Sequence, residues 1–119
     1  MRKLLFSTRR IVRGFSYSRK GMSYVFKNEI AFRQDVFVFL IGAILSFFLP
    51  VTAVARAIMI FSLFFILLME MVNTAIEVII DRISREKHPL SGHAKDIGSA
   101  LVLISFINAI IVWITIILN

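Results

Sequence analysis

Three long apolar runs decide the solvent in which this chain folds. They lie at residues 36–50, 57–69 and 97–119, and most of the charge falls between or before them. Hydrophobic residues make up 59% of the 119 positions and charged residues only 18%. A soluble domain of this size would need more polar surface to cover its core. The runs therefore predict membrane-spanning helices, and the expected fold class is an all-α membrane protein.

The expected architecture is three transmembrane helices preceded by an amphipathic surface helix. Crossing a hydrocarbon core of about 30 Å takes about 20 helical residues, so the first span is expected to begin before its apolar run at 36–50. Pro50 ends the first span. The whole chain, 1–119, is expected to form one membrane domain. Its parts are a surface helix at 4–27, spans at 29–50 and 53–82, a cytoplasmic loop at 83–95 and a third span at 96–118.

The surface helix is predicted from apolar residues spaced among Arg and Lys in the N-terminal segment. Their spacings, near three to four and seven, suit a helix lying at the level of the lipid headgroups. Gly14 and Gly21 are candidate break points, and a disordered basic tail is the alternative. The apolar residues concerned are Phe6, Ile11, Phe15, Met22 and Phe26.

The basic residues indicate how the chain is oriented in the membrane. Nine of the fourteen lie within residues 1–33, and the segment 82–96 holds four more, whereas the turn at 50–56 holds only Arg56. Cytoplasmic flanks of membrane spans accumulate Lys and Arg, so the N-terminus and the 82–96 segment are expected in the cytoplasm. Anionic headgroups account for this charge, and no nucleic-acid partner is expected.

The second span carries a row of polar residues, called the polar stripe here: Glu70, Asn73, Glu77 and Asp81. At about 100° per helical residue, their spacings confine them to a sector of roughly 80°. A charged side chain inside a bilayer costs about 2.5–3.5 kcal/mol on insertion scales, so the stripe should face helices, water or a ligand. The acids also repel one another. Mg²⁺ would relieve that repulsion, since it takes oxygen ligands and shares them with substrate phosphates.

Other charged residues are expected at the same membrane level as the polar stripe. Carboxylates, an amide and several cations at one interface suit phosphoryl transfer. That reaction needs a metal to bridge phosphates, cations for the developing charge and a base for the attacking hydroxyl. The additional residues are Glu29 and Asp35 at the first span, Lys95 and Asp96 after the loop, and Arg10, Arg13 and Lys20 near the N-terminus.

Two readings other than a kinase remain open at this point. The stripe can hydrogen-bond helices together in a purely structural anchoring subunit. Alternatively, Glu70 and Glu77 can relay protons or cations in a small oligomeric transporter. The cations of the 82–96 segment favour phosphate chemistry over transport. The sequence contains no cysteine and none of the motifs typical of P-loop ATPases, protein kinases, zincins or serine hydrolases.

The sequence also resembles a known family, the small prokaryotic integral-membrane diacylglycerol kinases of Gram-negative type. The resemblance rests on EMVNTAIEVIIDRIS (70–84), LSGHAKDIGSALVLI (90–104), YSRKG (17–21) and NEIAFRQD (28–35). It implies that ATP and Mg²⁺ are used to phosphorylate diacylglycerol to phosphatidic acid. It also implies a homotrimer of three-span subunits in the bacterial cytoplasmic (inner) membrane, with active sites between subunits and the membrane lipid around them.

Carried onto this sequence, the resemblance implies individual roles. Glu70 would be the general base that accepts the proton of the lipid hydroxyl, with Asn73 beside it in the catalytic centre. Glu29 and Glu77 would bind the divalent metal, supported by Asp35 and Asp81. The implied nucleotide contacts are Arg10, Tyr17, Glu29, Glu77, Glu86, Lys87, His88, Lys95 and Asp96. The implied lipid-site residues are Arg10, Arg33, Arg56, Glu70, Ser99 and Trp113.

Two positions depart from the family pattern. His93 stands where Arg is expected after Ser-Gly, and Asp35 stands where the longer Glu is expected. The Gram-positive branch of the superfamily shares the N-[ST]-A-I-E core but phosphorylates undecaprenol, which is therefore the alternative substrate. The segment DRISREKHPLSGHAKDIGSA (81–100) resembles the diacylglycerol branch and favours diacylglycerol.

Overall fold

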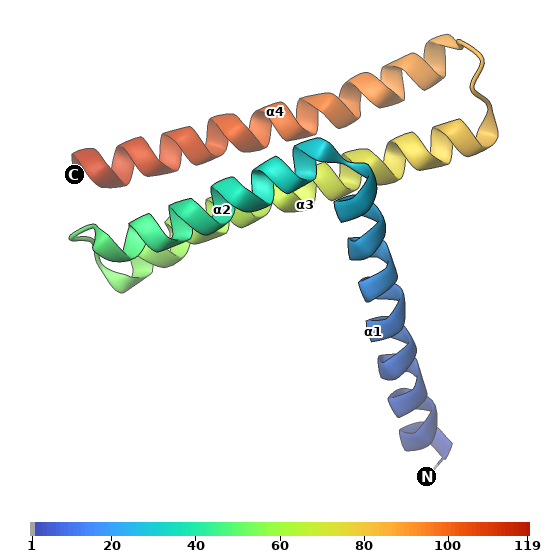
Figure 1. Cartoon of the computed structure of the whole chain (residues 1–119), viewed down its shortest axis with the longest axis horizontal. Helices are drawn as coiled ribbons and strands as arrows, with labels where there is room; N and C mark the ends of the chain where they lie inside the picture. The colour runs from blue at the N-terminus through green and yellow to red at the C-terminus, as the bar shows by residue number, and fades with distance from the viewer. Residues whose placement is uncertain (1) are drawn as a thin grey trace. The chain divides into compact units, whose positions relative to one another are not determined.

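A computed structural model describes the backbone of residues 2–119 and the side chains from Thr8 onward. Phe6, one of the expected apolar residues of the surface helix, lies outside the described side chains. The described backbone contains helices and no strands, which confirms the all-α fold class. The helices are α1 (Arg2–Asn28), α2 (Ile30–Phe48), α3 (Ala53–Ile83) and α4 (Pro89–Leu118) (Figure 1).

The chain divides into two compact units, residues 1–30 and 31–119, which are described separately. In the first unit, α1 is one continuous helix of 27 residues that runs through Gly14 and Gly21. Neither expected break occurs, and the disordered-tail alternative is wrong for this segment. Ile11, Phe15 and Met22 are exposed on α1, as an interfacial helix requires of residues that enter the headgroup layer.

In the second unit, three helices are long and apolar enough to cross a membrane: α2 with 19 residues, α3 with 31 and α4 with 30. About 20 residues suffice to span the hydrocarbon core, so α3 and α4 have turns to spare for the interface. The expected three spans are confirmed.

The connection between α3 and α4 is shorter than the loop expected at 83–95. Residues 84–88 lie outside the helices, and residues 89–95 form the first turns of α4. His88 is the N-cap, and its Nδ1 accepts a hydrogen bond from the Leu90 amide at 3.1 Å. Pro89 occupies the first helical turn, where a missing N–H leaves no hydrogen bond unmade. Pro89 therefore begins α4, although it lies within the segment expected to form a loop.

α3 and α4 lie side by side and antiparallel along their length (Figure 1). Leu63, Ile66 and Ala109 form a buried core between them. Trp113 packs against this core, and its Nε1 donates hydrogen bonds to the Met59 carbonyl and the Ser62 Oγ, both at 3.2 Å. Packing and interhelical hydrogen bonds of this kind hold helices together in lipid, where no hydrophobic effect operates between them.

α2 joins this pair through aromatic contacts and through Arg56. The rings of Phe39 on α2 and Phe64 on α3 lie 5.9 Å apart, centroid to centroid. Arg56 donates hydrogen bonds from Nε to the Ser46 carbonyl at 3.0 Å and from an Nη to the Leu49 and Val51 carbonyls at 3.4 and 3.3 Å. These carbonyls lie at or just beyond the end of α2, where helical partners are lacking. Arg56 thus ties the α2–α3 turn together.

Candidate active site

The polar stripe lies along α3 with a graded exposure. Glu70 is buried, Asn73 and Glu77 are half-buried, and Asp81 is exposed in the last turns of the helix. The stripe therefore runs from the protein interior to its polar end. A reacting group on a lipid would meet Glu70, whereas a water-soluble group would meet Asp81 first.

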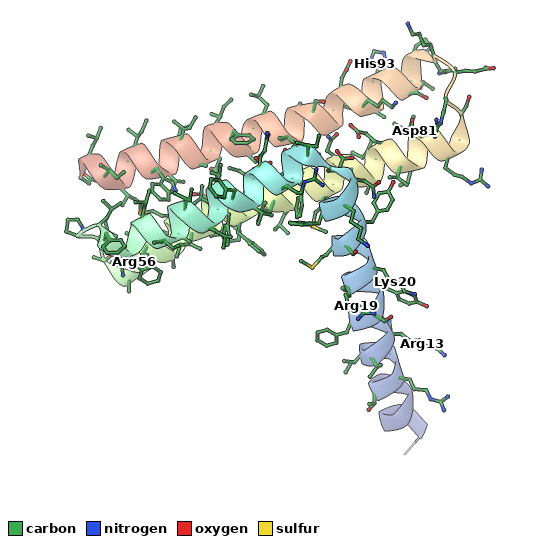
Figure 2. All side chains as sticks on the ribbon, viewed as in Figure 1. Arg13, Arg19, Lys20, Arg56, Asp81 and His93 are labelled. Carbon is green, nitrogen blue, oxygen red and sulfur yellow. The ribbon has the colours of Figure 1, made fainter. Side chains whose placement is uncertain are left out.

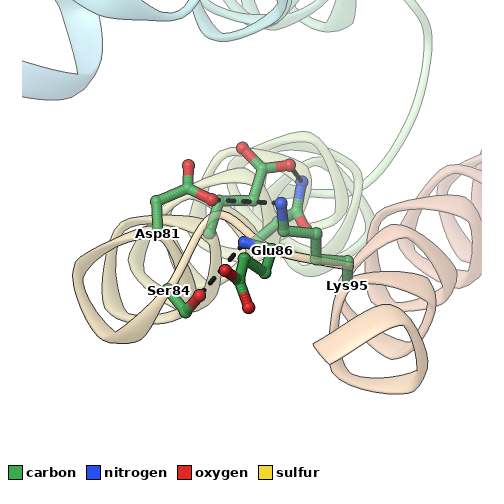
Figure 3. A network of polar contacts seen from close by, with 6 residues as sticks. Asp81, Ser84, Glu86 and Lys95 are labelled. Atoms are coloured by element: carbon green, nitrogen blue, oxygen red, sulfur yellow. Dashed lines mark hydrogen bonds and ion pairs between the residues drawn. The ribbon is translucent and has the colours of Figure 1, made fainter. Parts of the chain in front are cut away.

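α4 lies against the outer half of the stripe. Lys95 Nζ forms an ion pair with Asp81 Oδ1 at 3.1 Å (Figure 3). Three residues further along, buried Gly98 lies against Asn73 and Ile76. The antiparallel pairing of α3 and α4 thus brings together residues that the sequence separates by the turn. Both partners of the ion pair are nearly half exposed, at 46% and 44%, so the pair is screened by water and weak.

Within the stripe, Asn73 holds Glu77. Asn73 Nδ2 donates a hydrogen bond to Glu77 Oε1 at 3.4 Å. The other end of the same amide, Oδ1, is buried and accepts no hydrogen bond from the described residues. A buried acceptor without a donor costs about 1–3 kcal/mol. The amide is held in this orientation by the hydrogen bond that its NH₂ group donates to Glu77.

A hollow of about 450 Å³, called the turn pocket here, lies at the connection between α3 and α4. It gathers four of the expected nucleotide contacts, Glu86, Lys87, His88 and Lys95. In this turn, the Glu86 amide donates a hydrogen bond to Ser84 Oγ at 3.1 Å (Figure 3). The lining residues for which sequence reasoning assigned no role are Ile80, Ser84, Arg85, Pro89, Ser91 and Gly92.

Arg85 is the most informative of these missed residues. With Lys87 and Lys95 it gives the turn pocket three cationic side chains. The sequence signal was present, because Arg85 belongs to the basic cluster of the 82–96 segment. Which basic residues of that segment border the pocket depends on where the helices end, and Arg82 is not among them.

In the first unit, a hollow of about 450 Å³ is lined by Arg9, Arg10, Arg13, Gly14 and Tyr17. It brings Arg10 and Tyr17, two expected nucleotide contacts, onto the same part of α1. Lys20 lies with its Nζ 5.8 Å from the centroid of the Tyr17 ring. Figure 2 shows Arg13, Arg19 and Lys20 along this helix. No acidic residue precedes Glu29 in the sequence, so α1 presents a uniformly basic polar surface.

The other expected site residues are dispersed. Glu29 lies between α1 and α2, with its amide donating to the Val25 carbonyl at 2.9 Å. Asp35 is buried on α2, and its Oδ2 finds no hydrogen-bond donor among the described residues. Arg33, Asp96 and Ser99 are exposed. Arg56 lies at the end of α3 opposite Asp81 (Figure 2), and Trp113 packs against the core near it.

The donor atoms of the described side chains limit what kind of metal site this chain can form. Among the described side chains, no group of three or more His, Cys, Asp or Glu residues gathers as a cage for an ion. Glu77, oriented by Asn73, offers carboxylate oxygen. Mg²⁺ in phosphoryl-transfer sites usually takes one or two carboxylates and completes its shell with phosphates and water. A single carboxylate such as Glu77 is compatible with an ion that arrives together with a phosphate group.

Comparison with known proteins identifies the family of the chain. The family model described as prokaryotic diacylglycerol kinase matches residues 16–117. The diacylglycerol kinase of Escherichia coli strain K12 is 43% identical over 104 residues, which cover 87% of this chain and 85% of that protein.

Two further relatives extend the comparison. The diacylglycerol kinase of Haemophilus influenzae is 42% identical over 103 residues, covering 87% of each chain. That of Pseudomonas aeruginosa is 39% identical over 111 residues, covering 93% of this chain and 90% of the relative. On the strength of a match across nearly the whole chain and of these identities, the chain belongs to the prokaryotic diacylglycerol kinase family.

Proposed function

We propose that this protein transfers the γ-phosphate of ATP to the free hydroxyl of diacylglycerol, giving phosphatidic acid at the cytoplasmic face of the bacterial inner membrane. One observation carries the proposal beyond family membership. The polar stripe leads from buried Glu70 to exposed Asp81, and a pocket with three cations adjoins its exposed end. A lipid hydroxyl and a water-soluble phosphate donor can therefore approach one row of residues from opposite sides.

Glu70 is the proposed general base. Its burial on α3, a helix long and apolar enough to cross a membrane, supports a role with a hydroxyl carried by a lipid. In the transfer step the hydroxyl oxygen attacks the γ-phosphorus while its proton passes to the Glu70 carboxylate. The bond from the γ-phosphorus to the bridging oxygen breaks, and ADP leaves. Positioning and electrostatic stabilisation supply most of the rate enhancement in reactions of this class.

The nucleotide end of the proposed site uses Glu77 and the turn pocket. Glu77 and Glu29 would hold a magnesium ion that accompanies ATP, and the ion would supply positive charge against the negative charge of the phosphates. Asn73 keeps the Glu77 carboxylate in place through its hydrogen bond. Lys95 can leave its exposed, weak pairing with Asp81 for a phosphate oxygen, since phosphate offers more negative charge than one carboxylate.

Arg10 and Tyr17 on α1 are proposed as further nucleotide contacts, with Glu86, Lys87, His88 and Asp96 from the turn and α4. The proposed lipid site uses Arg10, Arg33, Arg56, Ser99 and Trp113. Self-association into homotrimers with shared active sites is part of the same proposal. The exposure of Arg33, Asp96 and Ser99 in the single chain supports it, because these polar groups remain accessible to a substrate or to another copy.

The test is transfer of labelled γ-phosphate from ATP in mixed micelles containing Mg²⁺. Short-chain diacylglycerol and undecaprenol are offered in parallel to the unsubstituted protein and to Glu70→Gln. We expect diacylglycerol to be labelled by the unsubstituted protein, and the labelling rate to fall at least about 100-fold in Glu70→Gln, as general-base removal does.

Each outcome of this test has a separate meaning. Labelling of undecaprenol alone would replace the proposed substrate. Labelling of diacylglycerol by Glu70→Gln at the unsubstituted rate would remove Glu70 from its role. Family membership already disfavours the transporter and anchoring-subunit readings of the stripe. Thermal unfolding of Glu70→Gln, compared with that of the unsubstituted protein, checks that lost activity does not reflect lost structure.

A further inference from the structure

Gly98 is one of the points at which α4 contacts the polar stripe. It is buried in α4, and a Cβ added there would overlap Asn73 Oδ1. The same Cβ would lie 3.3 Å from Asn73 Cγ and 3.5 Å from Ile76 Cδ1. The Asn73 amide oxygen therefore occupies the space that any residue other than glycine would fill with its own side chain.

This packing leaves room for the Asn73 amide between Gly98 and Glu77. The oxygen lies against the α4 backbone, and the NH₂ group is left to donate to Glu77 Oε1 at 3.4 Å. The oxygen is buried there without a hydrogen-bond donor among the described residues. The hydrogen bond to Glu77 decides which end of the amide faces Gly98, since the reverse orientation would set the amide oxygen against a carboxylate that only accepts. The missing side chain of Gly98 supplies the space in which the amide lies in this position.

We propose that Gly98 is a positioning residue, whose lack of a side chain sets the Asn73 amide and, through it, the Glu77 carboxylate. The inference rests on the proposed function, in which Glu77 holds the metal that accompanies ATP. Carboxylates that bind metals depend on such outer hydrogen bonds for their orientation. A methyl group at Gly98 would turn the Asn73 side chain away and release Glu77, while leaving every proposed substrate contact in the sequence.

The backbone does not require glycine at this position. None of the described glycines has a positive φ, and alanine is favoured over glycine inside a helix. Gly98→Ala therefore tests the added methyl group and little else. Asn73 has a short side chain that can rotate. Its displacement should therefore disturb the geometry of the site more than it lowers the stability of the fold.

Two other glycines provide matched controls. A Cβ at Gly21 in α1 would meet nothing within 4 Å. A Cβ at Gly42 in α2 would meet the end of the Leu63 side chain and lie 3.6 Å from Trp113 Cζ2. Gly21→Ala thus controls for the substitution itself. Gly42→Ala controls for disturbed helix packing away from the polar stripe.

The first experiment measures phosphoryl transfer as a function of ATP and Mg²⁺ concentration, together with thermal unfolding in micelles. We expect Gly98→Ala to lose about 10- to 100-fold in kcat/KM for ATP, as small misplacements at active sites do, and to need more Mg²⁺ for half-maximal rate. Its melting temperature should not fall. Gly21→Ala should match the unsubstituted protein in kcat/KM, in melting temperature and in the Mg²⁺ concentration for half-maximal rate. Gly42→Ala should change the melting temperature but not that Mg²⁺ concentration.

The second experiment is a double-mutant cycle with Asn73→Ala. If Gly98 acts through Asn73, adding Gly98→Ala to Asn73→Ala should cause no further loss. Multiplicative losses would overturn the proposal, as would a Gly98→Ala enzyme with unchanged kinetics or one whose loss of rate follows a loss of stability.

A third measurement does not depend on activity. The side-chain NH₂ resonances of Asn73 in the metal-free protein, assigned by their absence in Asn73→Ala, report the environment of the amide. We expect them to shift in Gly98→Ala and to stay in place in Gly42→Ala. Unshifted resonances in Gly98→Ala would refute the positioning role even if the protein proved to phosphorylate another lipid. A shift in a protein that labels no lipid would instead leave the positioning intact and remove the proposed function.

Discussion

At the scale of single residues, the polar stripe is graded in burial, from buried Glu70 to exposed Asp81. Its members repeat every three or four residues, so their common face follows from helical geometry. The partners of these side chains do not follow from helical geometry. The Asn73–Glu77 contact lies within one helix turn, whereas Asp81 pairs with Lys95 from the next helix. Glu77 and Asp81 are therefore held by different neighbours, and substitutions beside them should have different effects.

Substitution of Arg85 tests whether the turn pocket binds the phosphates of ATP. We expect Arg85→Gln to raise the KM for ATP about two- to fivefold with little change in kcat, because an exposed ion pair contributes up to about 1 kcal/mol. Steady-state kinetics at low salt would measure the effect, and added salt should shrink it. Arg82→Gln removes an equal charge from outside the pocket lining and serves as the control. Equal KM values for the two variants would contradict a phosphate contact at Arg85.

At the scale of elements, helix ends determine what the chain presents to substrates. Pro89 and His88 start α4 early, which confines the connection to residues 84–88 and forms the turn pocket there. At the opposite end of α3, Arg56 binds the carbonyls that follow α2 and lies 5.1 Å from the Phe47 ring centroid. Both features depend on local capping chemistry. One shapes the proposed nucleotide site, and the other stabilises a turn.

The two roles available to Arg56 predict different results. As a tie between α2 and α3, Arg56→Lys should lower stability by about 1–3 kcal/mol, because an ammonium cannot reproduce the spread of guanidinium hydrogen bonds to several carbonyls. Thermal unfolding in micelles measures that loss. If Arg56 instead belongs to the lipid site, Arg56→Lys should raise the KM for diacylglycerol. A variant with unchanged stability and a raised KM would assign Arg56 to the lipid site alone.

At the scale of the whole molecule, the expected site residues fall into two compact units of the chain. Arg10, Tyr17 and Glu29 belong to residues 1–30, while Glu70 and Glu77 belong to residues 31–119. The proposed homotrimer with shared sites makes this division testable. If one copy supplies Glu29 and another supplies Glu70, inactive variants should complement each other when they assemble together.

We expect mixtures of Glu29→Gln and Glu70→Gln, unfolded and reassembled together, to regain up to about a quarter of the unsubstituted rate per site, by random combination of equal amounts. Phosphate transfer to diacylglycerol measures the recovery. Each variant reassembled by itself is the control. Absence of recovery, with mixed assembly verified by differently tagged chains, would place both residues in sites formed within one copy.

Much of this protein follows from the order of its residues. Apolar runs that enter lipid must be helical there, because unpaired backbone groups are too costly in the hydrocarbon core. Helical periodicity then places Glu70, Asn73, Glu77 and Asp81 on one face of α3. Both steps depend on neighbours along the chain, so they are predictable. The expected breaks in α1 failed because glycine lowers helix propensity without preventing a helix.

Only the tertiary structure decided what lies opposite that face. The pairing of α3 with α4 sets Lys95 beside Asp81 and Gly98 against Asn73. The residue at which α4 begins determines which basic side chains line the turn pocket. Arg85 lines it, and Arg82 does not. Which positions of two helices meet depends on the register of their packing. That register is settled by side-chain shapes on both helices together, so no single stretch of sequence reveals it.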